Sequence, residues 1–264
     1  MEVSGVLAKM RVADGDPISY ELHLGDARVV MNDLLGAELT VAFSGIRLCR
    51  VCGARVDELF GEGFCRRDFE SSPLNAPCIV RPELCEAHLG RGRDPAWEEA
   101  HHHRAHIVYL ADSGGVKVGV TGDNPLTRWI DQGAAAAVRI AEVPYRRIAG
   151  EIEVALKAAF SDRTAWQRML TSTGFDRDAL LLARSRAVAL IPEALRGHAR
   201  ADDPVVTLRF PMRATLAKVR SVDLGRQSEA RGRLIGIRGQ YLLFEDGAVL
   251  NVRRHTGFDV TLRA

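Results

Sequence analysis

The middle of the chain carries a set of side chains whose types could support phosphodiester hydrolysis: Tyr109, Lys117, Arg128 and Glu153. That reaction needs a positioned water, stabilisation of charge on the phosphate oxygens, and help for the leaving oxygen. The guanidinium of Arg128 can bind two phosphate oxygens, and Lys117 can add a second positive charge. Glu153 can hold a catalytic Mg²⁺ or Mn²⁺ ion, while the phenol of Tyr109 can orient or deprotonate the water.

The local pattern predicts the elements that position these groups. Two apolar runs joined by the turn-rich residues 111–115 predict a β-hairpin, and residues 121–125 break its second strand. The hairpin strands are expected at 107–110 and 117–121, followed by a helix at 126–132, a strand at 136–144 and a helix at 149–160. We expect the phenol, the guanidinium and the carboxylate to meet across a small antiparallel sheet.

Helical spacing distinguishes two neighbouring carboxylates. If the stripe of Ile152, Leu156 and Phe160 faces the core, Glu153 lies at its margin and Glu151 points into solvent. We therefore favour Glu153 as the metal-binding acid. Each group also has a structural interpretation: the phenol can be a packed aromatic, and either glutamate can pair with the lysine at position 157.

All five cysteines lie between Cys49 and Cys85, in a loop-rich segment. Such clustering favours metal over disulfides in a reducing compartment, and tetrahedral zinc takes four Cys or His ligands. We expect a structural zinc site at the knuckle formed by Cys49, Cys52 and the glycine that follows. The predicted ligands are Cys49, Cys52 and Cys65 with one of Cys78, Cys85 or His88.

Two zinc sites are the alternative. In that case Asp68 and Asn75 would stand where a further thiolate is expected, and aspartate is a possible ligand while asparagine is a poor one. The histidines at 101–103 are interpreted mainly as a linker, because adjacent imidazoles on a regular helix cannot all face one ion. His106 is the member of that group expected to be functional.

The segments differ in their patterns, which together predict an α+β fold. Both ends alternate like strands, and each alone has too few strands for a closed core, so we expect them to form one barrel or sandwich. The predicted organisation is an N-terminal β segment at 1–48, a zinc-binding module at 49–98, an α/β domain with a helical extension at 99–203, and a C-terminal β segment at 204–264 that packs with the first.

Composition sets few limits on partners. The formal net charge is +2, which neither demands nor excludes a polyanionic partner. No stretch has the length of a signal peptide or of a membrane span, so we expect a cytoplasmic protein with no membrane partner. Expected nucleic-acid contacts are Thr121, Trp129, Arg253 and Arg254.

The order strand, strand, helix, strand, helix, helix in the middle resembles the GIY-YIG nuclease fold. The two named tripeptides would be 107–109 and 117–119, and the family arginine and glutamate would be Arg128 and Glu153. Two departures are that the first glycine is absent and that Lys117 replaces the second tyrosine. The resemblance covers residues 105–165 and implies a central sheet with a metal-dependent nuclease site.

Five motifs are distributed along the chain: Cys-x-x-Cys-Gly at 49–53, Gly-Phe-Cys at 63–65, Pro-Glu-Leu-Cys-x-x-His-Leu-Gly at 82–90, Leu-Thr-Arg-Trp-Ile-Asp-Gln-Gly-Ala at 126–134 and Gly-Gln-Tyr-Leu at 239–242. In these motifs the chain as a whole resembles a bacterial family, domain of unknown function 2797. The family pattern prefers cysteines where this chain has Asp68 and Asn75, which argues against a second metal site.

The preferred hypothesis is a metal-dependent nuclease that acts on DNA, rather than RNA, or on structured nucleic acid. A structural zinc would hold the cysteine-rich module, and the terminal β region would grip the substrate. One rival is a zinc-containing nucleic-acid-binding protein that does not cleave, which the missing glycine and Lys117 favour. A second rival is a protein-interaction adaptor, which the modest net charge permits.

Overall fold

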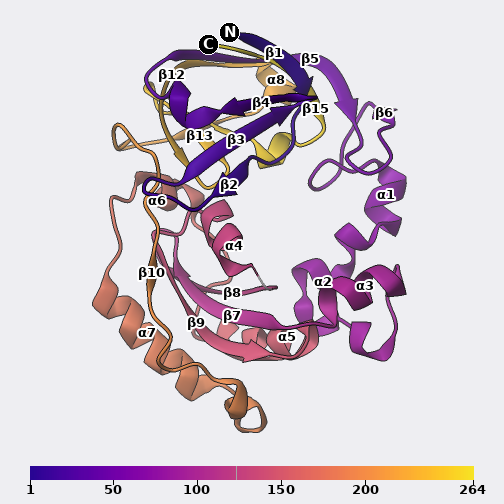
Figure 1. The fold of residues 1–264 in the computed structure, drawn as a ribbon, viewed down its shortest axis with the longest axis vertical. Coiled ribbons are helices and arrows are strands. Elements are labelled where there is room, and N and C mark those ends of the chain that lie inside the picture. Colours follow the sequence, from indigo (N-terminus) through magenta and orange to yellow (C-terminus); the bar gives the residue numbers. More distant parts are fainter. Residues whose placement is uncertain (123) are drawn as a thin grey trace. The chain divides into compact units, whose positions relative to one another are not determined.

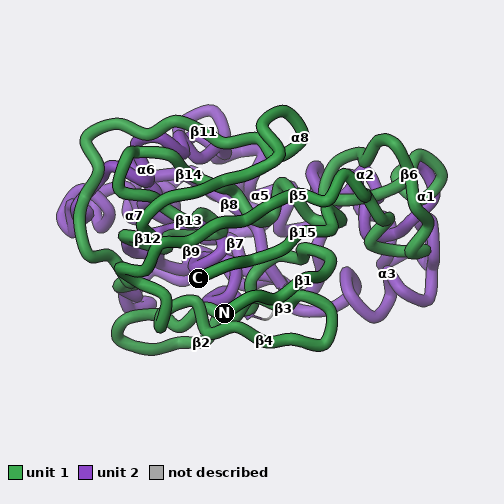
Figure 2. Tube along the Cα trace, turned by 90° about the horizontal axis from the view of Figure 1, so that it is seen from above, with its two compact units in different colours: residues 1–69, 208–264 green, residues 70–207 purple. Residues whose placement is uncertain are grey.

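The computed structural model describes residues 1–122 and 124–264 and shows a mixed α+β protein (Figure 1). Asp123, within the predicted strand break at 121–125, lies outside the described residues. The chain divides into two compact units, residues 1–69 with 208–264 (unit 1) and residues 70–207 (unit 2), coloured in Figure 2. The cysteine-rich segment 49–98, predicted as one module, is therefore divided between the two units within α1 (Arg66–Ser71).

Both ends of the chain contribute strands to one eight-stranded sheet in unit 1. Its order is β1-β15-β5-β12-β13-β14-β11, and β6 pairs with β5. Residues 2–6 pair antiparallel with residues 259–263, so the N- and C-terminal segments share backbone hydrogen bonds. A closed barrel or a sandwich stays a prediction. The strands are β1 (Glu2–Val6), β5 (Glu38–Leu48), β6 (Arg55–Val56), β11 (Arg220–Val222), β12 (Glu229–Arg238), β13 (Tyr241–Phe244), β14 (Ala248–Asn251) and β15 (Phe258–Arg263).

A three-stranded antiparallel sheet completes the β structure of unit 1. It consists of β2 (Arg11–Ala13), β3 (Ser19–Leu24) and β4 (Ala27–Val30), in that order. In β3, Tyr20, Leu22 and Leu24 are buried and alternate with less buried polar residues. This period of two is the pattern of a strand that covers a core with one face. The short helix α8 (Leu224–Gln227) precedes β12.

Unit 2 contains a four-stranded antiparallel sheet in the order β10-β9-β7-β8. Its strands β7 (His106–Asp112), β8 (Val116–Thr121) and β9 (Ala136–Val143) form where the sequence predicts strands, and β10 (Val206–Thr207) is added at one edge. β7 and β8 form the predicted hairpin, in which Tyr109 is opposite Gly119 and Ala111 is opposite Lys117.

Helices α5 (Arg146–Lys157) and α7 (Arg177–Leu190) cover one face of this sheet. The core between the sheet and these helices contains Val108, Leu110 and Val118 from the strands and Ile152 and Leu156 from α5. Because side chains alternate along a strand, Tyr109 and Lys117 lie on the other face. The remaining helices of unit 2 are α2 (Pro77–Val80), α3 (Pro95–His102), α4 (Pro125–Asp131) and α6 (Trp166–Thr171).

The local sequence explains where helix α4 begins. Asn124 caps α4 by accepting from the Thr127 N–H at 3.3 Å, and proline at the first helical position needs no N–H partner. Helix α5 begins at Arg146, three residues before the predicted start at Ala149.

Candidate metal centres and a buried polar site

Among the described residues, two groups of side chains could hold a metal ion such as zinc. Within each group, the candidate ligand atoms all lie within 4.8 Å of one another. The knuckle cluster belongs to unit 1 and consists of Cys49, Cys52, Cys65 and Asp68. The buried cluster belongs to unit 2 and consists of Cys78, Cys85, Glu98 and His102.

The knuckle cluster is built by a tight turn after β5. Gly53, which has a φ of 70°, reverses the chain behind the first two cysteines, a conformation that favours glycine. The Sγ atoms of Cys52 and Cys65 are 3.9 Å apart, and Cys49 Sγ is 3.2 Å from Asp68 Oδ2. Three thiols and one carboxylate therefore surround one point, with Cys52 exposed to solvent.

Hydrogen bonds link the side chains of the knuckle cluster. A hydrogen bond to Asp68 raises the pKa of the Cys52 thiol to about 11, and the same bond lowers the pKa of the Asp68 carboxyl. Arg67 Nε also donates to Asp68 Oδ1 at 2.9 Å. Because thiolates are the metal ligands, binding of an ion here releases protons and depends on pH.

The buried cluster is assembled from separate elements. Glu98 and His102 are four residues apart on α3, so both side chains lie on one face of that helix. His102 Nδ1 is 3.7 Å from Cys78 Sγ and 3.7 Å from Glu98 Oε2, and Cys78 Sγ is 4.0 Å from Glu98 Oε2. All four candidate ligands are buried, and the second glutamate oxygen accepts from the Arg93 N–H at 2.9 Å.

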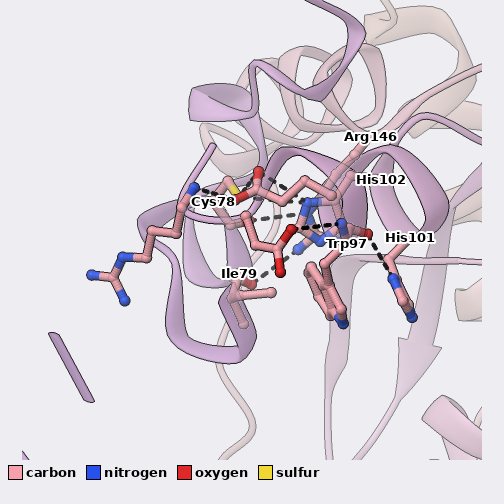
Figure 3. Close-up of polar contacts among 9 residues, drawn as sticks. Cys78, Ile79, Trp97, His101, His102 and Arg146 are labelled. Carbon is pink, nitrogen blue, oxygen red and sulfur yellow. Dashed lines mark hydrogen bonds and ion pairs between the residues drawn. The ribbon is translucent and has the colours of Figure 1, made fainter. Parts of the chain in front are cut away.

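A half-buried arginine lies beside this cluster. Arg146, the first residue of α5, donates from Nε to the Cys78 carbonyl and from a terminal nitrogen to the Ile79 carbonyl, both at 3.0 Å (Figure 3). The thiol of Cys78 donates to Cys85, which lowers the pKa of Cys85 to about 4 and raises that of Cys78. The cluster therefore favours one thiolate, at Cys85.

The structure groups the candidate ligands differently from the predicted sets. Asp68 takes the fourth place beside Cys49, Cys52 and Cys65, because α1 brings position 68 next to the first knuckle. His88 belongs to neither group of candidate ligands among the described residues, and its ring stacks on Tyr145 with centroids 4.7 Å apart.

Sequence reasoning missed Glu98 and His102 as candidate ligands. Their signal was the spacing of four on a helix that begins after Asp94, whose carboxylate accepts from the Trp97 N–H. Interpreting residues 101–103 as a linker hid that spacing. His106 lies buried in β7, its Nδ1 is 2.8 Å from the Arg104 carbonyl, and burial lowers its pKa to about 4.

The polar site of unit 2 begins with Tyr109, which is 0% exposed. Its ring lies over Gly119, where a Cβ would be 2.6 Å from the phenol oxygen, so glycine is needed for this close approach. The hydroxyl donates to Gln132 Oε1 at 2.9 Å. Burial raises the pKa of Tyr109, and the charge of Arg128 opposes this shift.

Lys117 is buried at the same face, near the edge of β8. Its Nζ donates to Thr164 Oγ1 at 2.5 Å, and the backbone at Ser161 pairs with this strand. Burial and, to a smaller extent, the positive charge of Arg128 lower the pKa of Lys117 to about 7. Two cationic groups therefore lie within electrostatic reach of each other, an arrangement that an anion would stabilise.

Glu153 is buried, and Glu151 is exposed and accepts from Arg147 Nε at 3.0 Å, as the apolar stripe of α5 predicts. Burial raises the pKa of Glu153. Its Oε2 is 3.3 Å from the Nζ of Lys157, which also lies 3.4 Å from Asp162 Oδ2. The glutamate therefore forms the ion pair named as its structural alternative.

Electrostatic interactions thus connect the four predicted side chains. The charges of Arg128 and Glu153 shift the pKa values of both Tyr109 and Lys117. The phenol donates to Gln132, and the amine donates to Thr164. Arg128 is half-buried, and its Nε has no hydrogen-bond partner among the described residues.

The predicted nucleic-acid contacts are placed differently from one another. Trp129 is only 3% exposed and packs edge-on against Tyr109, so it supports the polar site and is not available to stack on a base. Thr121 ends β8 and is half-buried. In unit 1, Arg253 pairs with Glu62 at 2.7 Å, and the exposed Arg254 lies 3.9 Å from Asp223.

The fold and these clusters define an α+β protein with two cysteine-containing candidate metal centres. The chain belongs to the family described as "Protein of unknown function (DUF2797)", whose model matches residues 36–260. No curated protein and no solved structure matches the chain. Over the described residues, every helix is too short or too polar to cross a membrane.

Proposed function

We propose that unit 2 is a metal-dependent nuclease of GIY-YIG type that hydrolyses phosphodiester bonds in DNA or structured nucleic acid. One observation supports the proposal most: the charges of Arg128 and Glu153 act on both Tyr109 and Lys117. These four residues come from four different elements. Clustered groups with shifted pKa values in a folded chain are characteristic of functional sites.

The chemistry of the donor set fits an anionic substrate. Arg128 is the more exposed member and has a buried Nε available, so its guanidinium would bind the non-bridging phosphate oxygens. Lys117, with a pKa of about 7, would add charge or accept a proton near neutral pH. Glu153 would hold one Mg²⁺ or Mn²⁺ ion, since Mg²⁺ sites use one or two carboxylates together with substrate phosphates.

Cleavage of supercoiled DNA with Mn²⁺ tests this proposal. Arg128→Ala and Glu153→Gln are each expected to lower the cutting rate at least about a hundredfold, the scale of one lost transition-state contact. The matched controls are Arg147→Ala and Glu151→Gln, which alter an exposed ion pair on α5 and should cut at the wild-type rate. Equal rates in all four variants would reject the assigned site.

A second candidate is a nucleic-acid-binding protein that does not cleave. It is favoured by the complete burial of Tyr109, whose hydroxyl is already used by Gln132. The two functions differ in one experiment: this candidate predicts no cleavage with Mn²⁺, but a binding affinity whose logarithm falls linearly with the logarithm of salt concentration.

A further inference from the structure

We propose that Cys78, Cys85, Glu98 and His102 bind one zinc ion, separate from any ion in the knuckle cluster, and that this zinc fixes helix α5 and thereby positions Glu153. The metal site and its coupling to the helix depend on different contacts.

The distances within the buried cluster are those of ligands around a common ion. Atoms bound to one tetrahedral zinc at about 2.0 to 2.3 Å lie about 3.3 to 3.8 Å apart. Two of the separations, both 3.7 Å, fall within this range, and the third, at 4.0 Å, lies just above it. The separation between His102 and Glu98 is too long for a hydrogen bond. A buried imidazole and a buried carboxylate at that distance gain little from each other but would both gain from an ion between them.

Charge supports the same conclusion. Two thiolates and one carboxylate around Zn²⁺ leave a net charge of about −1 in a site that water does not reach. The half-buried guanidinium of Arg146 supplies the opposite charge, and the charges of Cys78 and Cys85 act on it. The Arg93 N–H holds the remaining oxygen of Glu98, as a supporting contact does for a metal-bound carboxylate.

The coupling to α5 runs along one face of that helix. Arg146 bonds to the carbonyls of Cys78 and Ile79. One turn later, a Cβ at Gly150 would be 2.1 Å from the Glu83 backbone nitrogen, so the loop that includes η3 (Pro82–Leu84) packs directly on the helix backbone. Glu153 follows at the next turn of the same face, because positions 146, 150 and 153 recur at helical spacing.

The loop that contacts α5 is the loop that carries Cys78 and Cys85. It has only short helical segments, α2 and η3, and isolated helices of this length are unstable in water. An ion bound to both cysteines and to α3 would supply the missing stability and hold the loop against Arg146 and Gly150.

Zinc content tests the site. The wild-type chain is expected to contain two equivalents of zinc by elemental analysis, and Glu98→Gln one equivalent, since an amide is a poor zinc ligand. Glu99→Gln is the matched control, because Glu99 is exposed on the same helix and pairs with His103, and this variant should keep both ions. An equal zinc content in the wild type and in Glu98→Gln would overturn the site.

Amide hydrogen exchange tests the coupling. In Glu98→Gln the amides of α5 are expected to exchange at least about tenfold faster, while those of β12 in unit 1 keep their rates. Arg146→Met should keep both zinc ions and still show faster exchange in α5, which also provides the test if Glu98→Gln does not fold. Loss of one zinc with unchanged exchange in α5, or unchanged exchange in Arg146→Met, would overturn the coupling.

The effect on cleavage rests on the proposed function, whereas zinc content and hydrogen exchange do not. If zinc content and hydrogen exchange agree with the expectations but the chain does not cut DNA with Mn²⁺, the proposed nuclease function alone is wrong. If the chain cuts DNA but wild type and Glu98→Gln contain the same amount of zinc, the buried zinc site alone is wrong.

Discussion

The knuckle cluster and the buried cluster use similar ligands in different settings. The four residues of the knuckle cluster fall within twenty positions of sequence, from Cys49 to Asp68, and one of its thiols is exposed. In the buried cluster every ligand is buried, two come from helix α3, and Arg146 ties the site to α5. The comparison indicates that the first cluster stabilises its own turn, while the second also supports a neighbouring helix.

The largest effect is expected at the contact between the buried cluster and α5. Gly150→Ala should destabilise the chain by at least about 3 kcal/mol, because the new Cβ would collide with the Glu83 backbone. Helix propensity alone predicts the opposite, a gain of about 1 kcal/mol. Urea denaturation measures the change, and a gain in stability would show that the loop does not press on the helix.

A buried lysine distinguishes the polar site of unit 2 from the exposed surface. The folded pKa of Lys117, about 7, lies below its usual 10.5, so the unfolded chain binds more protons between these values. Wild-type stability should therefore rise with pH across this window. Lys117→Met should be more stable than wild type by about 2 kcal/mol at pH 6, and the difference should shrink as pH approaches 10.5.

Lys218→Met, which changes an exposed lysine, is the control for this titration. Urea denaturation at a series of pH values from 6 to 10.5 gives the comparison. A stability difference between wild type and Lys117→Met that does not change with pH would contradict the burial of a charged amine at this position.

The two clusters should release zinc at different rates. A chelator can reach the exposed Cys52 directly, but it can reach the buried cluster only after the loop opens. We expect two phases, the slower at least about tenfold slower, in an absorbance assay with a coloured chelator. Cys52→Ser should remove the fast phase and leave the slow one, and a single phase in the wild type would contradict the difference in accessibility.

The smallest effect is expected at the turn of the knuckle cluster. Gly53 has a φ of 70°, and a Cβ added there would have no described atom within 4 Å. The loss of stability in Gly53→Ala should therefore come from backbone strain alone. The expected cost is about 1 kcal/mol, measured by urea denaturation. A loss as large as that of Gly150→Ala would show that the knuckle turn is also packed against the fold.

Local patterns in the sequence predict much of unit 2. The hairpin of β7 and β8, helix α4 and strand β9 form where turn residues and apolar runs place them. The burial of Glu153 and the exposure of Glu151 follow from the stripe on α5. These features depend on residues that are close in sequence, so they can be predicted from one amino-acid sequence.

The metal ligands show what local patterns omit. The pairs Cys49 with Cys52, and Cys85 with His88, have the same spacing, yet His88 stacks on Tyr145 instead of facing the thiols. The place beside Cys78 and Cys85 goes to Glu98 and His102, which helix α3 brings in from later in the chain. Tertiary packing determines which residues form a group of ligands, and sequence spacing alone does not reveal that packing.

X-ray absorption at the zinc edge of the purified wild-type chain tests the central claim most directly, because it reports the metal and its ligands together. The account predicts two zinc ions per chain with a mixed first shell, in which five sulfur atoms and three nitrogen or oxygen atoms are shared between the two ions. A single zinc ion with a shell of four sulfur atoms would contradict the account.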